Sequence, residues 1–472
     1  MRDLVIVSNR VSVPQAGRQQ AGGLAVAINN ALASHGGIWF GWNGEVSDAR
    51  ESARCTQRGN VTYATLPLQQ REHDEYYLGF SNEVLWPIFH LNLGAMNFHR
   101  RFAETYYATN ERFASEITPL LKGNELIWVH DYHLIPLGNA LRRRDVDTPI
   151  GFFLHIPFPS AELLRCIPGH KRLLMQFLDY DLLGFQTPRD QESFRDAATR
   201  ILGATVKGNV LFHGDRRVRL GTYPVGVDVD TLQQESQHSE TKRTLMNLRA
   251  SLGHCALIAG ADRLDYSKGL SMRLGAIQEL LEHYPEYRRK VLYTQVASPS
   301  RCAINEYDEL RQKLETQAGH INGLYSDLGW APVHYINKTY PRAVLMGLFR
   351  AARVGLVTPV RDGMNLVCKE FVAAQDPQDP GVLVLSEFAG AAQELDGALL
   401  VNPYDPHTIT QALHQALQMP QEERRQRHAS MLKNLTHNSL TQWWQRFVED
   451  LRYTLPHALS TLPPARRSII NG

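Results

Sequence analysis

Two series of short, apolar, β-rich runs separated by helical stretches constrain the fold of this chain more than any other feature. The first series comprises residues 4–7, 126–129, 150–154, 182–185 and 218–224, and the second comprises 256–260, 291–296, 333–336, 354–357, 382–385 and 399–401. Short buried strands that alternate with helices are typical of parallel sheets with helices on both faces. The sequence therefore predicts an α/β protein with two parallel-sheet domains.

The length of the chain supports two domains, because 472 residues are too many for a single hydrophobic core. The polar stretch 233–241 suits a junction between them. We expect an N-terminal domain over 1–228, a C-terminal domain over 229–438, a terminal helix over 439–456 that packs back on the N-terminal domain, and a disordered tail over 457–472.

Composition excludes several classes of protein. The net charge is +2 and basic residues form no long run, which argues against nucleic-acid or membrane-surface binding through bulk charge. The five cysteines are scattered without a CxxC pair, so neither a disulfide framework nor a zinc site is indicated. The run 4–7 is too short for a signal peptide, and no apolar run approaches the ~20 residues of a membrane span. We expect a cytoplasmic enzyme.

The segment TPVRDGMNLVCKE, residues 358–370, is predicted to be a loop that leads from a strand into a helix. Free backbone N–H groups at the start of that helix can bind a phosphate or a polar sugar edge. Asp362 lies in the loop, and Glu370 is expected about two turns into the helix. An ordinary strand–helix turn, with an acid that suits the helix dipole, remains an equal alternative.

Polar residues follow several predicted strands at the edge where doubly wound sheets bind ligands. Arg10, Asp131 and His155 occupy such positions in the first series. Gly22-Gly23, just before a predicted helix over 24–33, form a second possible phosphate cradle. The first unit has no GxGxxG, and the chain has no GxxxxGK[ST], so a nicotinamide dehydrogenase or a P-loop NTPase is disfavoured.

Arg263 and Lys268 follow the first strand of the second series and are predicted to share one loop. Two cations in one loop can clamp a diphosphate, with Asp265 orienting them. A solvated, salt-bridged loop is the alternative.

Aromatic and metal-ligating residues leave further alternatives open. The segment 39–44 with Tyr76, Tyr77 and Trp86 can stack on sugar rings, although each ring alone is more often part of a core. His130, Asp131 and His133 could in principle bind a metal, but no second cluster has matching spacing. Asp228 and Asp230 form a DxD that is more typical of a helix cap. We therefore expect no metal and no cofactor.

Taken together, these residues suit a sugar-diphosphate donor and a polar, phosphorylated acceptor. The chain also contains, in order, SNR (8–10), AGGL (21–24), WFGWNG (39–44), HDYHL (130–134), FFLHIPFP (152–159), DRLDYSKG (262–269) and TPVRDGMNLVCKE (358–370). This series closely resembles glycosyltransferase family 20, the trehalose-6-phosphate synthases. The resemblance implies the GT-B fold, with two Rossmann-like domains that face each other across the active site. It also implies glucose transfer from UDP-glucose to glucose 6-phosphate with retention of configuration, for trehalose biosynthesis and stress protection.

The resemblance also implies roles for individual residues. The acceptor, glucose 6-phosphate, would be bound by Arg10, Tyr77, Asp131 and Arg301, with both arginines on its phosphate. The donor, UDP-glucose, would be bound by Gly22, Gly23, Arg263, Lys268, Tyr340, Asp362, Gly363, Met364, Asn365, Leu366 and Glu370. Catalysis would rest on Arg263, Lys268, Asp362 and His155, and Trp86 and Ile156 would flank the anomeric carbon and select the anomer.

The chain departs from the family pattern at two positions. Asp262 stands where the family often has Glu, and Tyr340 where it often has Phe, and neither change puts the resemblance in doubt. A related enzyme with glycerol 3-phosphate as acceptor and a catalytically silent sugar-phosphate sensor are the rival hypotheses. ADP- or GDP-glucose as donor also stays open, and a homo-oligomer, a dimer or tetramer, is expected. Because no carboxylate is well suited as a nucleophile, we predict no covalent intermediate.

Overall fold

The chain folds into two compact units. The computed structural model describes residues 3–14, 23–300 and 305–454, so the predicted tail over 457–472 lies outside the described residues. One unit, the N-terminal domain, comprises the described residues up to Pro224 together with those from Thr441 onward. The other, the C-terminal domain, comprises Val225–Leu440. Each is an α/β domain built on its own sheet, as the strand pattern predicts.

The N-terminal sheet has ten strands in the order β3-β4-β2-β1-β5-β6-β7-β10-β9-β8. Their bounds are β1 Leu4–Arg10, β2 Gly37–Ser47, β3 Arg54–Arg58, β4 Val61–Gln69, β5 Leu126–His130, β6 Ile150–Phe153, β7 Leu182–Phe185, β8 Thr205–Lys207, β9 Val210–His213 and β10 Arg216–Thr222. The strands from β4 to β10 run parallel, and antiparallel partners close both edges. The predicted parallel strands are confirmed, whereas β2, β3, β4, β8 and β9 were not predicted.

The aromatic segment at 39–42 is a buried part of β2. Trp39, Phe40 and Trp42 are at most 4% exposed. These rings are therefore part of the hydrophobic core. Of the two interpretations that the sequence left open, core packing and stacking on a sugar, the structure supports core packing for them.

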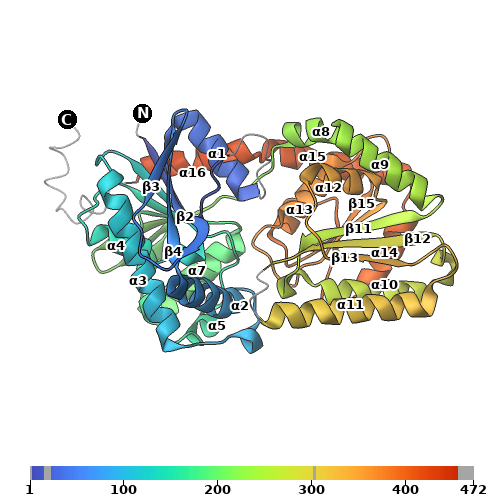
Figure 1. Cartoon of the computed structure of the whole chain (residues 1–472), viewed down its shortest axis with the longest axis horizontal. Helices are drawn as coiled ribbons and strands as arrows, with labels where there is room; N and C mark the ends of the chain where they lie inside the picture. Colours follow the sequence, from blue (N-terminus) through green and yellow to red (C-terminus); the bar gives the residue numbers. More distant parts are fainter. Residues whose placement is uncertain (1–2, 15–22, 301–304, 455–472) are drawn as a thin grey trace. The chain divides into compact units, whose positions relative to one another are not determined.

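Helices cover this sheet. Their bounds are α1 Gly23–His35, α2 Trp86–Phe89, α3 Arg100–Ile117, α4 Leu137–Arg142, α5 Ala161–Arg165, α6 His170–Gln176, α7 Pro188–Leu202 and α16 Leu440–Arg452, with a π-helix η1 over Glu72–Leu85 and 3-10 turns at η2 Leu93–Ala95, η3 Thr118–Leu120, η4 Tyr132–Leu134 and η5 Phe177–Asp179. Figure 1 shows red α16 beside the blue N-terminal strands, although its sequence follows the C-terminal domain. Its apolar face packs there, with the Phe447 ring stacked on Trp128 at 4.6 Å between centroids. This contact is hydrophobic and holds α16 on the first sheet.

The C-terminal sheet has six strands, all parallel, in the order β13-β12-β11-β14-β15-β16. Their bounds are β11 Ala256–Arg263, β12 Val291–Ser298, β13 Val333–Ile336, β14 Val354–Val357, β15 Val382–Ser386 and β16 Leu399–Val401. The helices are α8 Val229–Ser236, α9 Ser239–Leu252, α10 Leu270–His283, α11 Asn305–Tyr325, α12 Arg342–Ala351, α13 Leu366–Ala374, α14 Pro406–Gln418 and α15 Gln421–His437, with short turns at η6 Tyr266–Lys268, η7 Pro285–Tyr287 and η8 Gly390–Gln393.

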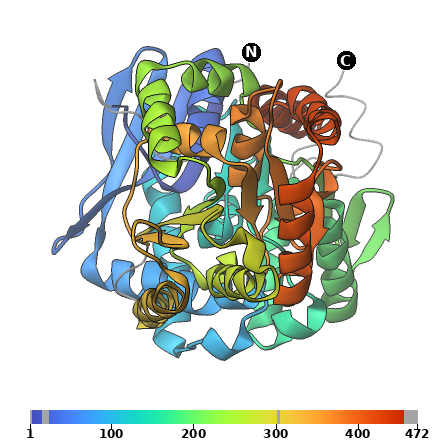
Figure 2. The ribbon, with the colours of Figure 1, turned by 90° about the vertical axis from the view of Figure 1, so that its right-hand side faces the viewer.

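The helices of this domain form two layers around the sheet. In Figure 1, α10, α11 and α14 lie on one side of the strands, and α8, α9 and α12 lie on the other. Figure 2 faces this domain, with gold α11 seen nearly end-on. One apolar cluster joins α10 and α14 to the strands and includes Leu274, Ile277 and Leu413, all at most 1% exposed. The sheet is therefore buried on both faces, which explains its continuous apolar strands.

Two local predictions differ from the structure. The stretch 233–241, expected as a polar junction, is mostly helical, because α8 and the start of α9 occupy it. The strand expected over 256–260 continues to Arg263 as β11. No helix within the described ranges is long and apolar enough to cross a membrane.

Candidate active site

The loops that follow β11 and β14 lie side by side in the C-terminal domain. β11 and β14 are neighbouring parallel strands, although β12 and β13 come between them in the sequence. After β11 the chain adds β12 and β13 next to one edge of β11, and it then returns to form β14 next to the other. The carboxyl ends of two such strands form the position where open α/β sheets bind ligands.

Backbone contacts fix these two loops against each other. The N–H of Val360 donates to the carbonyl of Ser267 at 2.8 Å. Gly269 has a φ of +68°, and a Cβ placed there would lie 2.2 Å from the carbonyl oxygen of Thr358. Glycine is required because a side chain would both strain the backbone and separate the loops.

Lys268, Asp362 and Asn365 form a polar cluster where the two loops meet. The Nζ atom of Lys268 is paired with Oδ2 of Asp362, and both side chains are largely buried. The Asn365 amide donates to the same carboxylate oxygen at 3.1 Å. Arg263 is the exposed last residue of β11 rather than a loop residue, which corrects the predicted placement of both cations in one loop.

Helix α13 begins at this cluster, as the strand–loop–helix prediction requires. Asn365, with a φ of +75°, is its N-cap, and its side-chain oxygen accepts from the N–H of Cys368 at 3.3 Å. The first N–H groups of a helix have no partner within that helix, which suits them to bind an anion. The predicted distance of Glu370 along the helix is wrong, because it is the fifth residue of α13 and lies about one turn in.

Glu370 faces Arg342, the first residue of α12, at 3.4 Å. Burial raises the pKa of the Glu370 carboxyl, and the nearby Arg342 guanidinium opposes that rise. Tyr340 lies in the loop just before α12 and is partly exposed. The two residues assigned to the nucleoside thus flank the start of the same helix.

A residue that the sequence analysis missed holds both loops. Arg273 of α10 is fully buried and donates to Asp262 at 2.6 Å and to the Thr358 hydroxyl at 3.0 Å. It also donates to the carbonyl of Lys268 at 3.0 Å. Burial raises the pKa of Asp262, and the Arg273 guanidinium works against that rise. A cation among the buried residues of α10, beside Leu270 and Leu274, is the signal that could have revealed it.

In the N-terminal domain, the ends of β5 and β6 meet in the same way. Asp131 follows β5 with a φ of +75°, an unusual conformation for a non-glycine residue. Its N–H donates to the carbonyl of Phe153 at 2.8 Å, and its Oδ1 accepts from the N–H of His155 at 3.2 Å. The structure therefore brings together two predicted site residues that are far apart in the sequence.

Aromatic rings surround the neighbouring positions. Arg10, exposed at the end of β1, lies over the Trp42 ring with 5.6 Å from its guanidinium carbon to the ring centroid. Tyr77, on the π-helix η1, stacks on His133 at 5.9 Å and packs against Trp42 at 5.2 Å. π-helical segments are frequent at functional sites.

The two residues assigned to the anomeric carbon are mostly buried. Trp86 is 4% exposed and packs on His90 at 3.9 Å, and Ile156 is 6% exposed. Only a small part of either side chain is therefore open to a ligand.

His155 is hydrogen-bonded to a second histidine that the sequence suggested only as a metal ligand. Nδ1 of His130 lies 3.0 Å from Nε2 of His155. Burial lowers the pKa of His130 well below its usual range and lowers that of His155 to about 3. Both imidazoles are therefore neutral at physiological pH.

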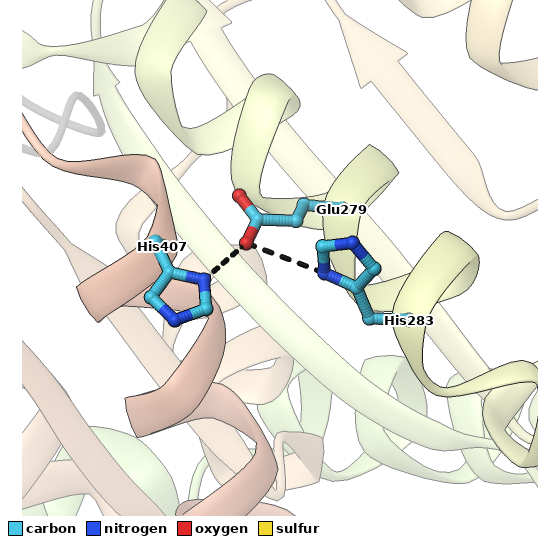
Figure 3. A group of neighbouring side chains, drawn as sticks. All are labelled: Glu279, His283 and His407. Carbon is cyan, nitrogen blue, oxygen red and sulfur yellow. Dashed lines mark hydrogen bonds and ion pairs between the residues drawn. The ribbon is translucent and has the colours of Figure 1, made fainter.

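One other group of side chains could hold a metal ion. Glu279 and His283 of α10 and His407 of α14 place their ligand atoms within 4.8 Å of one another, and Figure 3 shows both imidazoles directed at the same carboxylate oxygen. The Nδ1 atoms lie 2.6 Å from that oxygen in His407 and 3.5 Å in His283. Among the described residues, no other His, Cys, Asp and Glu side chains come together in this way. The sequence could not reveal this group because α10 and α14 are distant in the chain. Asp228 caps α8, accepting from the N–H of Thr231, as predicted.

Comparison with known proteins places this geometry in a family. The sequence model of glycosyltransferase family 20 matches residues 4–453. The chain belongs to this family.

Relatives match over nearly the whole chain. The chain is 47% identical to a trehalose-6-phosphate synthase of Citrobacter koseri over 463 residues, which is 98% of each chain. It is 45% identical, with a TM-score of 0.91, to an α,α-trehalose-phosphate synthase (UDP-forming) of Burkholderia xenovorans in complex with glucose-6-phosphate, covering 95% of this chain and 100% of that one. A structure from E. coli bound with UDP-2-fluoro glucose is 45% identical with a TM-score of 0.93, covering 96% and 100%.

Gly22 and Arg301 lie outside the described residues, and Gly23 is the first residue of α1. Asp262, where the family often has Glu, forms an ion pair with buried Arg273.

Proposed function

We propose that this family 20 glycosyltransferase transfers glucose from UDP-glucose to glucose 6-phosphate, giving α,α-trehalose 6-phosphate and UDP. The observation that carries the proposal is the 47% identity to a trehalose-6-phosphate synthase over 98% of both chains. Similar solved structures, one in complex with glucose-6-phosphate and one bound with UDP-2-fluoro glucose, support the two substrates.

The C-terminal domain would bind the donor. Lys268 and Arg263 would meet the diphosphate, and the backbone N–H groups at the start of α13 would add fixed dipoles at the same place. Asp362, held by Lys268 and Asn365, would accept hydrogen bonds from sugar hydroxyls. Glu370 would bind the ribose, and the main chain at Tyr340 the base. Met364 and Leu366 bracket Asn365 and would contribute their amides, with Gly363 keeping the approach open.

The N-terminal domain would bind the acceptor. Arg10 and Arg301 would bind its phosphate through charge-assisted hydrogen bonds, which are stronger than neutral ones. Tyr77 and Asp131 would contact its hydroxyls, and Trp86 and Ile156 would border the reacting carbon. His155 would contact the transferred glucose.

We infer that transfer proceeds without a covalent glucosyl-enzyme. The acceptor hydroxyl oxygen would bond to the anomeric carbon on the face from which the diphosphate oxygen departs, and a leaving phosphate oxygen would take the hydroxyl proton. Asp362 is a poor nucleophile because Lys268 and Asn365 both contact Oδ2 of its carboxylate, where they stabilise its negative charge. Intact-mass analysis with donor and an unreactive acceptor analogue should show unmodified enzyme, and a glucosyl ester formed at the turnover rate would contradict this mechanism.

A donor and acceptor screen that follows nucleotide release tests the function. UDP-glucose with glucose 6-phosphate should give the fastest release, with α,α-trehalose 6-phosphate identified by NMR. Faster nucleotide release with glycerol 3-phosphate would identify that compound as the acceptor instead. Binding of sugar phosphate without nucleotide release would indicate a sensor. ADP- and GDP-glucose in the same screen define the nucleotide preference. We further propose that the enzyme works in the cytoplasm as a homo-oligomer; sedimentation tests the latter.

A further inference from the structure

The His130–His155 contact admits two arrangements of its shared proton. Either Nδ1–H of His130 donates to Nε2 of His155, or Nε2–H of His155 donates to Nδ1 of His130. Because each ring is neutral, the choice also fixes the proton on the two remaining nitrogens. In the first arrangement His155 carries its proton on Nδ1, and in the second it does not.

The surroundings of His130 decide between them. His130 is fully buried, and its Nε2 atom has no hydrogen-bond partner among the described residues. The rings against it belong to Trp128, Phe153 and Trp443, at 4.4 to 6.4 Å between centroids. Both indoles are donors only, and their N–H groups are also buried without a partner in the described part of the chain.

An N–H group on Nε2 of His130 would be a buried donor with no acceptor, which costs ~1–3 kcal/mol. Buried N–H groups without an acceptor are rarer in proteins than acceptors without a donor, and both neighbouring indoles offer only donors. The proton of His130 therefore belongs on Nδ1, where it donates to Nε2 of His155. The proton of His155 then belongs on Nδ1, the ring nitrogen that does not contact His130.

We propose that His130 is a positioning residue that holds His155 as the Nδ1–H tautomer, so that His155 offers a neutral hydrogen-bond donor to a hydroxyl oxygen of the bound sugar. This inference rests on the proposed function, because that function supplies the sugar. His155 is partly exposed at the end of β6, whereas His130 is enclosed behind it, so only His155 is able to touch a ligand. The carboxylate of Asp131 accepts the backbone N–H of His155 at 3.2 Å.

Substitutions at His130 separate this role from simple packing. His130→Asn keeps an N–H donor close to the place of Nδ1 and should retain kcat within about threefold. His130→Leu removes the donor and should lower kcat about tenfold or more, with little change in the KM for glucose 6-phosphate, since a hydrogen bond of this kind contributes ~1 kcal/mol or more. His428→Asn is the matched control, because His428 is also buried but bonds to the Val372 carbonyl in the C-terminal domain.

A double-mutant cycle gives the decisive kinetic result. His155→Ala should lower kcat, and His130→Leu should add no further loss in that background, because it acts through His155. Independent losses that multiply would overturn the proposal. So would a normal kcat for His130→Leu.

NMR of histidine labelled with nitrogen-15 reads the tautomers directly, and His130→Asn and His155→Ala assign the signals. Both rings should carry the proton on Nδ1, and a proton on Nε2 of His155 would overturn the proposal. This result does not depend on catalysis. If wild-type enzyme forms no trehalose 6-phosphate, the proposed function fails while the NMR result still decides the tautomer.

Discussion

In each domain the candidate site residues lie at the carboxyl ends of the strands, called here the N-terminal edge and the C-terminal edge after the domain. The two edges differ in the chemistry of their side chains. At the C-terminal edge, ion pairs dominate: Lys268 with Asp362, and fully buried Arg273 with Asp262. At the N-terminal edge, neutral rings dominate: the His130–His155 pair and the stack of Tyr77 on His133.

This difference matches the charge of the groups that each edge would bind. A leaving diphosphate gains negative charge during the reaction, so fixed cations stabilise the transition state more than the ground state. Sugar hydroxyls carry no charge, and neutral donors and acceptors bind them without burying a charge. The fully buried charges within the C-terminal edge are tolerated because each has a partner.

The largest effect is expected where a buried charge loses its partner. Arg273→Met should lower the free energy of unfolding of the C-terminal domain by about 3–5 kcal/mol, because Asp262 remains buried without a countercharge. Urea unfolding measures this effect. Adding Asp262→Leu should recover most of the stability, and Arg311→Met, at an exposed pair on α11, is the control. Equal stability of wild type and Arg273→Met would show that the pair is not needed.

Loss of a cation at the same edge should mainly affect turnover. Lys268→Ala or Arg263→Ala should lower kcat about 100-fold or more, because each would stabilise the leaving diphosphate. UDP release measures the rate, and Lys313→Ala, at an exposed lysine of α11, is the matched control. Near-normal turnover in both variants would contradict the idea that cations at this edge stabilise the leaving diphosphate.

At the N-terminal edge, the acceptor phosphate is the exception to neutral recognition. Arg10→Ala or Arg301→Ala should raise the KM for glucose 6-phosphate by about 10- to 100-fold, which corresponds to ~1.5–3 kcal/mol for a hydrogen bond to a charged group. Donor binding without acceptor should change much less, and Arg54→Ala on β3 is the exposed control. An equal loss of donor affinity would assign the arginine to the other substrate.

Acid should destabilise the neutral imidazole pair. Burial depresses the pKa of both histidines, so below an unfolded-state pKa of about 6.5 the unfolded chain binds protons that the folded chain does not. Stability therefore falls as pH drops, by up to about 1.4 kcal/mol per pH unit for each histidine. Denaturant unfolding between about pH 6.5 and 4.5 should show a shallower slope for His130→Asn. An unchanged slope would mean that His130 is charged in the folded protein.

The smallest effect is expected from chelation. Activity should survive exhaustive EDTA treatment, because Arg263 and Lys268 would supply the positive charge that the diphosphate needs. A double variant, His283→Ala with His407→Ala, should behave as wild type in the same assay. Complete loss of activity, restored by a single divalent ion, would require a metal site and direct attention to that group or to His130, Asp131 and His133.

The sequence by itself determined the α/β class, most of the parallel strands and the loop–helix unit at 358–374. These features are local, because apolar runs and turn residues repeat with the period of the element that they form. Polar residues that follow such runs, including Arg10, Asp131 and His155, could be placed at the carboxyl edges of the sheets for the same reason. The family motifs then supplied candidate roles for them.

Only the tertiary structure decided which groups support that site. Arg273 joins Asp262, Lys268 and Thr358 across three segments, and His130 meets His155 across two strands. The Glu279–His283–His407 group likewise joins α10 to α14, and the core position of Trp39 and Phe40 depends on strand β2 lying inside the sheet. Local patterns carry no information on these partners, because burial and side-chain pairing are set by contacts between segments that are distant in the sequence.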